Sequence, residues 1–157
     1  MSIDDKPGSS EDRALMALAI EQARAAVSEG EVPVGAIVSV AGKAMAAGHN
    51  RPISLNDPTA HAEILAIRQA ARALGVYRLT EAALYVTLEP CVMCVGAIIA
   101  ARLAKVVYGA RDEKAGALGS VYDIGRDGRL NHRIEVYGGV MADECGAILR
   151  EFFKTRR

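Results

Sequence analysis

Two short motifs constrain the fold of this chain. Their side chains can form one set of metal ligands only if the fold brings them together. The motif HAE contributes His61 and Glu63, and the motif PCVMC contributes Cys91 and Cys94. A neutral imidazole and two thiolates are ligands that zinc prefers. A structural zinc site normally takes four protein ligands, whereas a catalytic site takes three and leaves the fourth position to water. The motifs therefore indicate a catalytic zinc site, with Glu63 where a carboxylate can move protons for water.

The order of apolar runs and turn residues predicts helices that alternate with strands. The predicted helices cover residues 10–28, 58–74, 91–103 and 141–154, and the predicted strands cover residues 34–40, 44–48, 83–88, 105–108 and 133–137. This order is typical of an α/β fold, and we expect a three-layer α/β/α sandwich around one mixed five-stranded sheet. Each motif opens a helix, so the two helix N-termini can meet at one edge of the sheet. The long connection over residues 110–132 permits the last strand to run parallel to its neighbour.

The composition limits the classes of partner. The chain has 157 residues, which fits one domain, and 19 basic and 19 acidic residues give a net charge of zero. A bulk basic field is absent, so any affinity for nucleic acid must come from a local patch. The three cysteines, two of them in a CxxC, indicate metal or redox chemistry in a reducing compartment. With no apolar N-terminal segment and no membrane-length apolar run, we expect a cytoplasmic protein without a membrane partner.

Each motif is ambiguous when it is considered alone. A CxxC can be a redox pair, half of a zinc finger or two core cysteines, and an HxE is weaker evidence still. The redox interpretation fits a strand followed by CxxC at a helix start, but it leaves HAE unexplained. Because both motifs open helices and a strand precedes the second, their combination favours a metal centre.

Several other polar residues have two interpretations. Cys145 can be a fourth metal ligand or, as we favour, a small buried apolar group. His49 and His132 are expected to be surface or hydrogen-bonding groups. Asn50 can form a turn or recognise a base. The basic residues that end the chain, and that either complement the dipole of the last helix or bind phosphates, are Lys154, Arg156 and Arg157.

From about residue 12 to its end, the chain resembles the bacterial tRNA-specific adenosine deaminases. The stretches that carry the resemblance are EVPVGAI, NRPISLNDPTAHAEI, YRLTEAALYVTLEPCVMC, VVYGARDEKAGALGS, NHRIE and ADEC with the C-terminal FFKTRR. HAE and PCxxC are shared with deaminases of free cytidine, cytosine and guanine, and they form the signature of zinc-dependent deaminases. The GARD block, NHR and the FF-x-x-RR end are more specific to the tRNA enzymes. His49 departs from the pattern, because an aromatic residue is expected before Asn50.

The polar N-terminus predicts a disordered tail over residues 1–9. The resemblance implies a cytidine deaminase-like fold, with a zinc-dependent deaminase domain over residues 10–157. It implies a homodimer with active sites near the subunit interface. It also implies conversion of adenosine to inosine at the wobble position of a tRNA anticodon loop. One Zn²⁺ per subunit would be held by His61, Cys91 and Cys94.

The remaining implied roles fall on three residues. Glu63 would shuttle protons, Asn50 would contact the flipped base, and Asp112 would touch the RNA. One alternative is a deaminase of a free base or nucleoside of the guanine or cytosine type. The other is a non-enzymatic zinc or RNA-binding module, against which Glu63 argues, because a structural site needs no proton shuttle.

Overall fold

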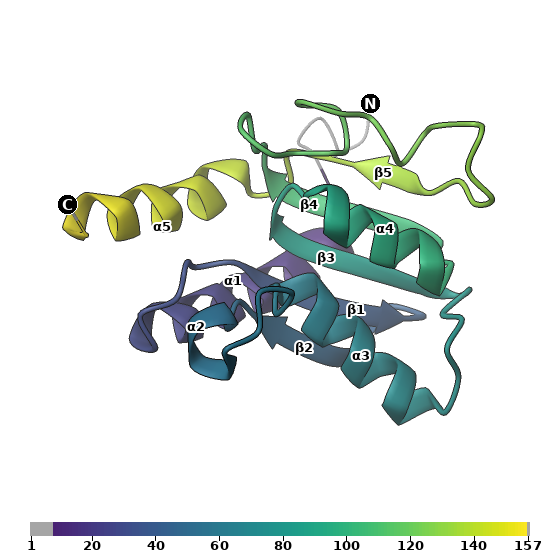
Figure 1. Cartoon of the computed structure of the whole chain (residues 1–157), viewed down its shortest axis with the longest axis horizontal. Helices are drawn as coiled ribbons and strands as arrows, with labels where there is room; N and C mark the ends of the chain where they lie inside the picture. The colour runs from purple at the N-terminus through teal and green to yellow at the C-terminus, as the bar shows by residue number, and fades with distance from the viewer. Residues whose placement is uncertain (1–7, 157) are drawn as a thin grey trace.

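A mixed five-stranded sheet forms the centre of the computed structural model, which describes residues 8–156 (Figure 1). The strands are β1 (Gly35–Val40), β2 (Lys43–His49), β3 (Ala82–Leu88), β4 (Lys105–Ala110) and β5 (Glu135–Tyr137). Their order across the sheet is β2-β1-β3-β4-β5. β1 is antiparallel to both neighbours, whereas β3, β4 and β5 are parallel. The last strand therefore runs parallel to its neighbour, as the long connection before it permits.

Helices cover both faces of this sheet. They are α1 (Ser10–Ser28), α2 (Pro52–Leu55), α3 (Ala62–Leu74), α4 (Val92–Ala101) and α5 (Ala142–Thr155). One buried apolar cluster packs α3 and α4 against one face, and a second packs α1 and the start of α5 against the other. The predicted three-layer α/β/α sandwich is confirmed. None of the helices within residues 8–156 is both long and apolar enough to cross a membrane.

One edge of the sheet collects the parts that carry the motifs. The carboxyl ends of β3 and β4 lie there, and so does the start of antiparallel β1, where the Gly35 N–H donates to the Thr87 hydroxyl at 3.1 Å. α3 crosses β2 closely at Gly48, because a Cβ there would lie 2.6 Å from the Ala62 carbonyl oxygen. α5 begins beside this edge and projects beyond the sheet (Figure 1). The edge is thus built from segments far apart in the sequence.

Helix starts account for the main errors of the sequence prediction. The helix predicted from Pro58 begins instead at Ala62, because the Asp57 carboxylate accepts from the Thr59 N–H at 2.9 Å and from its hydroxyl at 2.7 Å. These bonds hold a turn that competes with helix. The short α2 lies inside the stretch predicted as a loop. Of the predicted disordered tail, Ser9 caps α1 and the Gly8 carbonyl accepts from the Arg13 guanidinium at 2.5 Å. Residues 1–7 lie outside the described part of the chain.

Candidate active site

The two motifs meet at the N-termini of α3 and α4. His61 and Cys91 are the N-cap residues of these helices and have extended backbones, and Cys94 lies buried in the first turn of α4. The Nδ1 atom of His61 lies 3.6 Å from Cys91 Sγ and 3.4 Å from Cys94 Sγ. The three ligand atoms all lie within 4.8 Å of one another. Nδ1 is therefore the imidazole nitrogen that faces the two sulfurs.

These separations suit a tetrahedral zinc ion. Bond lengths of about 2.3 Å to sulfur and 2.0–2.1 Å to nitrogen at tetrahedral angles place the nitrogen and sulfur about 3.5–3.6 Å apart. The two observed nitrogen–sulfur distances are 3.6 Å and 3.4 Å. Within residues 8–156, this is the one group of histidine, cysteine or acidic side chains close enough to hold a metal ion. The His/Cys/Cys group is compatible with zinc.

The two thiols are electrostatically unequal. The hydrogen bond from Cys94, together with that to His61, lowers the pKa of Cys91 to about 4. The same bond between the cysteines, together with burial, raises the pKa of Cys94. The hydrogen bond between the two sulfurs thus favours the thiolate on Cys91 and the proton on Cys94. Binding a metal here releases a proton.

Glu63 lies in the first turn of α3, two residues from His61. Its side chain is buried, with 4% of its surface exposed. Burial raises the pKa of Glu63 to about 7, since removal from water penalises the charged carboxylate. A carboxyl group with a pKa near neutrality can both accept and donate a proton under physiological conditions. Its position and its protonation behaviour both suit proton transfer beside the His/Cys/Cys group.

Asn50 is fixed at the end of β2, beside the same helix start. Its side-chain oxygen accepts from the Ala62 N–H at 2.9 Å, and its own N–H donates to the Val34 carbonyl at 3.1 Å. Asn50 therefore helps to hold the turn that carries His61. Its Nδ2 amide makes no hydrogen bond to any residue within 8–156, so this group is available to a ligand.

Comparison with known proteins decides what kind of site this is. The sequence profile of the MafB19-like deaminase family matches residues 10–157. The tRNA-specific adenosine deaminase of Bacillus subtilis is 44% identical over 147 residues, which cover 94% of this chain and 91% of that protein. The chain belongs to the bacterial tRNA-specific adenosine deaminase family.

Solved structures support the same assignment. A structure from a study of A-to-I editing by tRNA:A34 deaminases matches this deaminase with a TM-score of 0.84 and 46% identity, and covers 87% of this chain and 99% of that one. The guanine deaminase from Nitrosomonas europaea is more distant, with a TM-score of 0.79 and 31% identity over 95% of this chain and 88% of that one. The predicted family and the cytidine deaminase-like fold are confirmed.

The deaminase holds Asp112 in a tight turn that follows β4. One Asp112 carboxylate oxygen accepts from the N–H groups of Lys114 and Ala115, at 3.0 Å and 3.1 Å. This bonding shapes the turn, and the RNA contact implied for Asp112 stays a prediction.

Glu89 is a buried anchoring residue beside the site that the sequence did not reveal. Only 2% of it is exposed, and its carboxylate accepts from the N–H groups of Asp112, Leu118 and Ser120 at 3.1, 2.9 and 3.1 Å. The Ser120 hydroxyl donates to it as well. Since Cys91 follows two residues later, Glu89 ties the 112–120 loop to the metal-ligand turn. The available signal was an acidic residue placed between a buried strand and Pro90.

A second carboxylate clamp lies on the other side of the site. Glu31 accepts from the Ile53 N–H at 3.3 Å and from the Ser54 N–H and hydroxyl, each at 2.7 Å. Glu29 accepts from His49 Nε2 and from Arg51 Nε, each at 3.1 Å. Together these bonds hold α2 and the chain around Asn50. His49, the departure from the family pattern, thus has a hydrogen-bonding role, as expected.

The other candidate residues have structural surroundings. Cys145 is buried in the α1–α5 apolar cluster, on the opposite face of the sheet from α3 and α4, so the expectation of a small buried group is confirmed. His132 bonds the Leu103 carbonyl through Nε2 at 2.6 Å. The Arg156 guanidinium lies 4.2 Å from the centre of the Phe152 ring. Lys154 is exposed on α5, and Arg157 lies outside the described residues.

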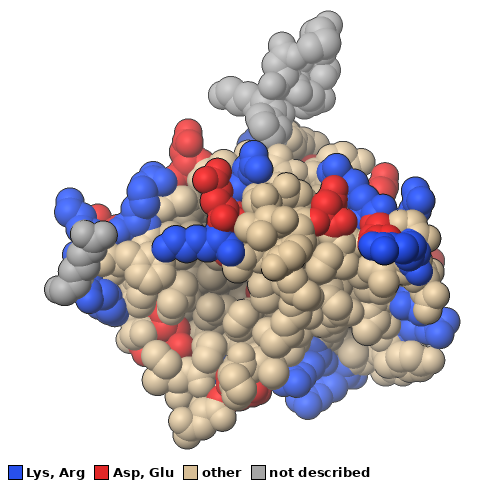
Figure 2. All heavy atoms as spheres, turned by 45° about the horizontal axis from the view of Figure 1, so that its top comes forward, with Lys and Arg blue, Asp and Glu red and all other residues tan. Residues whose placement is uncertain are grey.

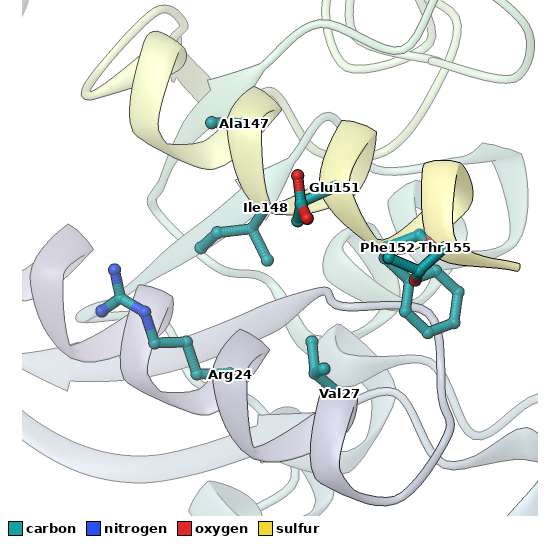
Figure 3. A pocket seen from close by; sticks show the side chains of 7 residues that line it. All are labelled: Arg24, Val27, Ala147, Ile148, Glu151, Phe152 and Thr155. Atoms are coloured by element: carbon teal, nitrogen blue, oxygen red, sulfur yellow. The ribbon is translucent and has the colours of Figure 1, made fainter.

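The surface carries no single basic field on the face shown in Figure 2, where lysine and arginine side chains alternate with acidic ones. A hollow of about 580 Å³ lies between α1 and the projecting α5 (Figure 3). It is lined by Arg24 and Glu151 together with apolar side chains such as Ile148, and it shares no residue with the His/Cys/Cys group. The hollow is therefore separate from the candidate active site at the helix N-termini.

Proposed function

We propose that this chain hydrolyses adenosine at the wobble position of a tRNA anticodon to inosine and ammonia. The observation that carries the proposal is the 44% identity to the tRNA-specific adenosine deaminase of Bacillus subtilis across nearly the whole of both chains. The His/Cys/Cys group with a buried Glu63 beside it supplies the chemical means. The target base must leave the stack of its loop to reach this group, which costs less in a single-stranded loop than in a duplex.

Zinc, one ion per subunit, belongs to this proposal. His61 through Nδ1, Cys91 and Cys94 would hold it, and the separations of their ligand atoms support that assignment. Bound there, zinc supplies a Lewis acid that makes water a nucleophile near neutral pH. The three protein ligands leave room for a fourth ligand, as in catalytic zinc sites.

Glu63 moves the protons in the proposed mechanism. Its carboxylate takes a proton from the attacking water and gives it to the ring nitrogen next to C6 of adenine. Glu63 then takes the proton of the new C6 hydroxyl and delivers it to the exocyclic amine. As the C–N bond breaks, the C6 carbonyl of inosine forms and ammonia leaves. Glu63 is buried in the first turn of α3, two residues after His61, so the fold keeps its carboxylate near the metal ligands during both transfers. Asn50 supports the base through its Nδ2 amide, and Asp112 contacts the RNA beside the target nucleotide.

Inosine formation tests the proposal directly. Purified, zinc-loaded protein is incubated with an anticodon stem-loop that carries adenosine at the wobble position, and the nucleosides are then separated after digestion. We expect inosine in place of that adenosine and little conversion of free adenosine. Absence of inosine from the stem-loop would contradict the proposal.

A free-base deaminase is the second candidate, because the guanine deaminase from Nitrosomonas europaea shares the fold and 31% of the sequence. The metal ligands and Glu63 do not distinguish the two activities. The substrate does, so guanine and cytosine are assayed beside the stem-loop. Efficient conversion of either base with the loop left intact would favour this second candidate.

A homodimer in the cytoplasm, where tRNA is found, completes the proposal. Large apolar side chains are exposed beside the site, with Ile53 on α2 72% exposed and Val92, between the two cysteine ligands, 47% exposed. A second copy that covers these side chains would also enclose the site. Sedimentation equilibrium tests this, and Ile53→Asp should shift the protein toward monomer whereas Tyr77→Asp, at an exposed site on the α3–β3 connection, should not.

A further inference from the structure

A hollow of about 410 Å³ lies beyond the carboxyl end of β4, between the loop that follows β4 and the start of α5. Arg111 and Arg126 both line it, although they lie far apart along the loop. Its remaining walls include Tyr108, Gly109 and Gly138, in addition to other small residues. The hollow therefore combines two cations with a largely uncharged floor.

The floor is closely packed. A Cβ at Gly109 would meet Cys145 Sγ and lie 2.8 Å from the Thr87 carbonyl oxygen, and a Cβ at Gly138 would meet the Tyr108 ring. These positions need glycine because of what lies behind them, so the floor keeps its shape. The two arginine side chains at the rim are exposed and can adjust to a ligand.

The charges of these two arginines are weakly compensated. Within residues 8–156, the one hydrogen bond from the Arg111 guanidinium is from Nε to the neutral Ser120 hydroxyl, at 3.1 Å. The Arg126 guanidinium lies 3.9 Å from an Asp123 carboxylate oxygen, beyond hydrogen-bonding distance. Arg129 of the same loop differs, since it forms two bonds of 2.9 Å and 2.6 Å with the Asp127 carboxylate. Arg111 and Arg126 thus keep N–H groups for an anionic ligand.

Hydrogen bonds connect the border of the hollow to the active site. Asp112 and Leu118 at its border both donate their N–H groups to Glu89, and the Ala117 N–H donates to the Pro90 carbonyl at 2.8 Å. Cys91 follows directly. These bonds therefore hold the rim that carries Arg111 in place relative to the metal ligands.

We propose that this hollow is a phosphate subsite, in which Arg111 and Arg126 bind one backbone phosphate of the RNA strand close to the target adenosine. The inference rests on the proposed function, because a polynucleotide supplies such a phosphate and a free base does not. The planar guanidinium fork matches the geometry of phosphate oxygens. Arg129, held by Asp127, takes no part.

The test compares Arg111→Gln, Arg126→Gln and the double variant with Arg129→Gln as the matched control. All are zinc-loaded, and their affinity for an anticodon stem-loop is measured over a range of salt concentrations. We expect each of the first two variants to bind about tenfold more weakly than the control. The log–log salt slope of the double variant should be smaller by about 0.7, the value for one phosphate of a single strand.

A second measurement locates the phosphate. Stem-loops that each carry one neutral methylphosphonate linkage are bound to the wild-type protein and to the double variant. At one position near the target, the neutral linkage should weaken binding to the wild-type protein. The same linkage should not weaken binding to the double variant, which no longer contacts that phosphate. Two results would overturn the subsite. One is that Arg111→Gln and Arg126→Gln bind the stem-loop as tightly as the control. The other is that every neutral linkage weakens the double variant as much as it weakens the wild type. Failure of the wild-type protein to form inosine in the stem-loop would instead contradict the proposed function.

Discussion

Replacing Glu89 by Gln should release the 112–120 loop from the active-site edge. One carboxylate oxygen of Glu89 accepts from the Asp112 N–H and the Ser120 hydroxyl, and the other accepts from the N–H groups of Leu118 and Ser120. A glutamine keeps one oxygen and replaces the other with an NH₂ group. The Ser120 hydroxyl can turn to accept from that group, whereas a backbone N–H cannot. The amide therefore faces Asp112 and leaves its N–H unpaired.

The magnitude follows from these four bonds. A buried unpaired donor costs about 1–3 kcal/mol, and each of the two remaining backbone bonds weakens by about 1 kcal/mol when its acceptor loses its charge. The sum is a loss of about 3–5 kcal/mol, which appears either as global destabilisation or as local opening of the loop, whichever costs less.

Hydrogen exchange with urea denaturation separates these outcomes in zinc-loaded protein. In Glu89→Gln the amides of Leu118 and Ser120 should exchange much faster than in the wild type. Glu31→Gln is the matched control, because Glu31 is equally buried but holds Ile53 and Ser54. It should speed exchange at those two residues and not in the 112–120 loop. Wild-type protection of Leu118 and Ser120 in Glu89→Gln, with stability changed by less than about 0.5 kcal/mol, would refute the anchoring role.

Four further outcomes are expected. Cys91→Ser should lose its zinc and Cys145→Ser should keep it, by elemental analysis; metal loss in the second variant would mean a four-ligand site. Glu63→Ala should keep zinc and lose at least ~10²-fold in rate, so near-normal turnover would remove it from the mechanism. Burial raises the pKa of Glu89, but hydrogen bonds from Ser120 and from backbone N–H groups outweigh it, and the pKa is lowered. The Glu89 carboxylate therefore stabilises the folded state above about pH 4.3, and this contribution is lost as the pH falls further. Acid unfolding should consequently be less steep in Glu89→Gln. Gly48→Ala should lower the free energy of unfolding by about 1–3 kcal/mol, measured by urea denaturation, because its Cβ would press on the backbone of α3. An unchanged urea midpoint would show that α3 can shift freely.

The layered fold was predictable because it depends on patterns that every segment carries. Alternating helices and strands, with a long connection before β5, leave few arrangements other than the observed sheet. Boundaries failed where one side chain competed with the helix, as Asp57 does before α3. The four-residue α2 offered only Pro52 at its first position as a local signal, and its first turn is held by Glu31, which is distant in sequence.

The juxtaposition of His61, Cys91 and Cys94 was also predictable, because each side chain has a chemistry that the sequence displays. The Glu89 clamp was not. Its partners are mostly backbone N–H groups, and backbone donors look the same at every position of a sequence. For a similar reason the sequence does not show which arginines of the loop after β4 are paired with a carboxylate. Asp127 binds Arg129 because the turn that contains them brings the two side chains together.

Three buried glutamates near one edge of the sheet show how hydrogen bonding separates an anchor from a proton carrier. Glu31, Glu63 and Glu89 are 1%, 4% and 2% exposed, so removal from water pushes the pKa of each one upward. For Glu31 and Glu89, converging N–H and hydroxyl donors outweigh burial, and the pKa lies below its ordinary value. For Glu63 burial prevails, and the pKa reaches about 7. The first two therefore stay charged and hold loops, whereas Glu63 can change its protonation state, as the proposed role in deamination requires.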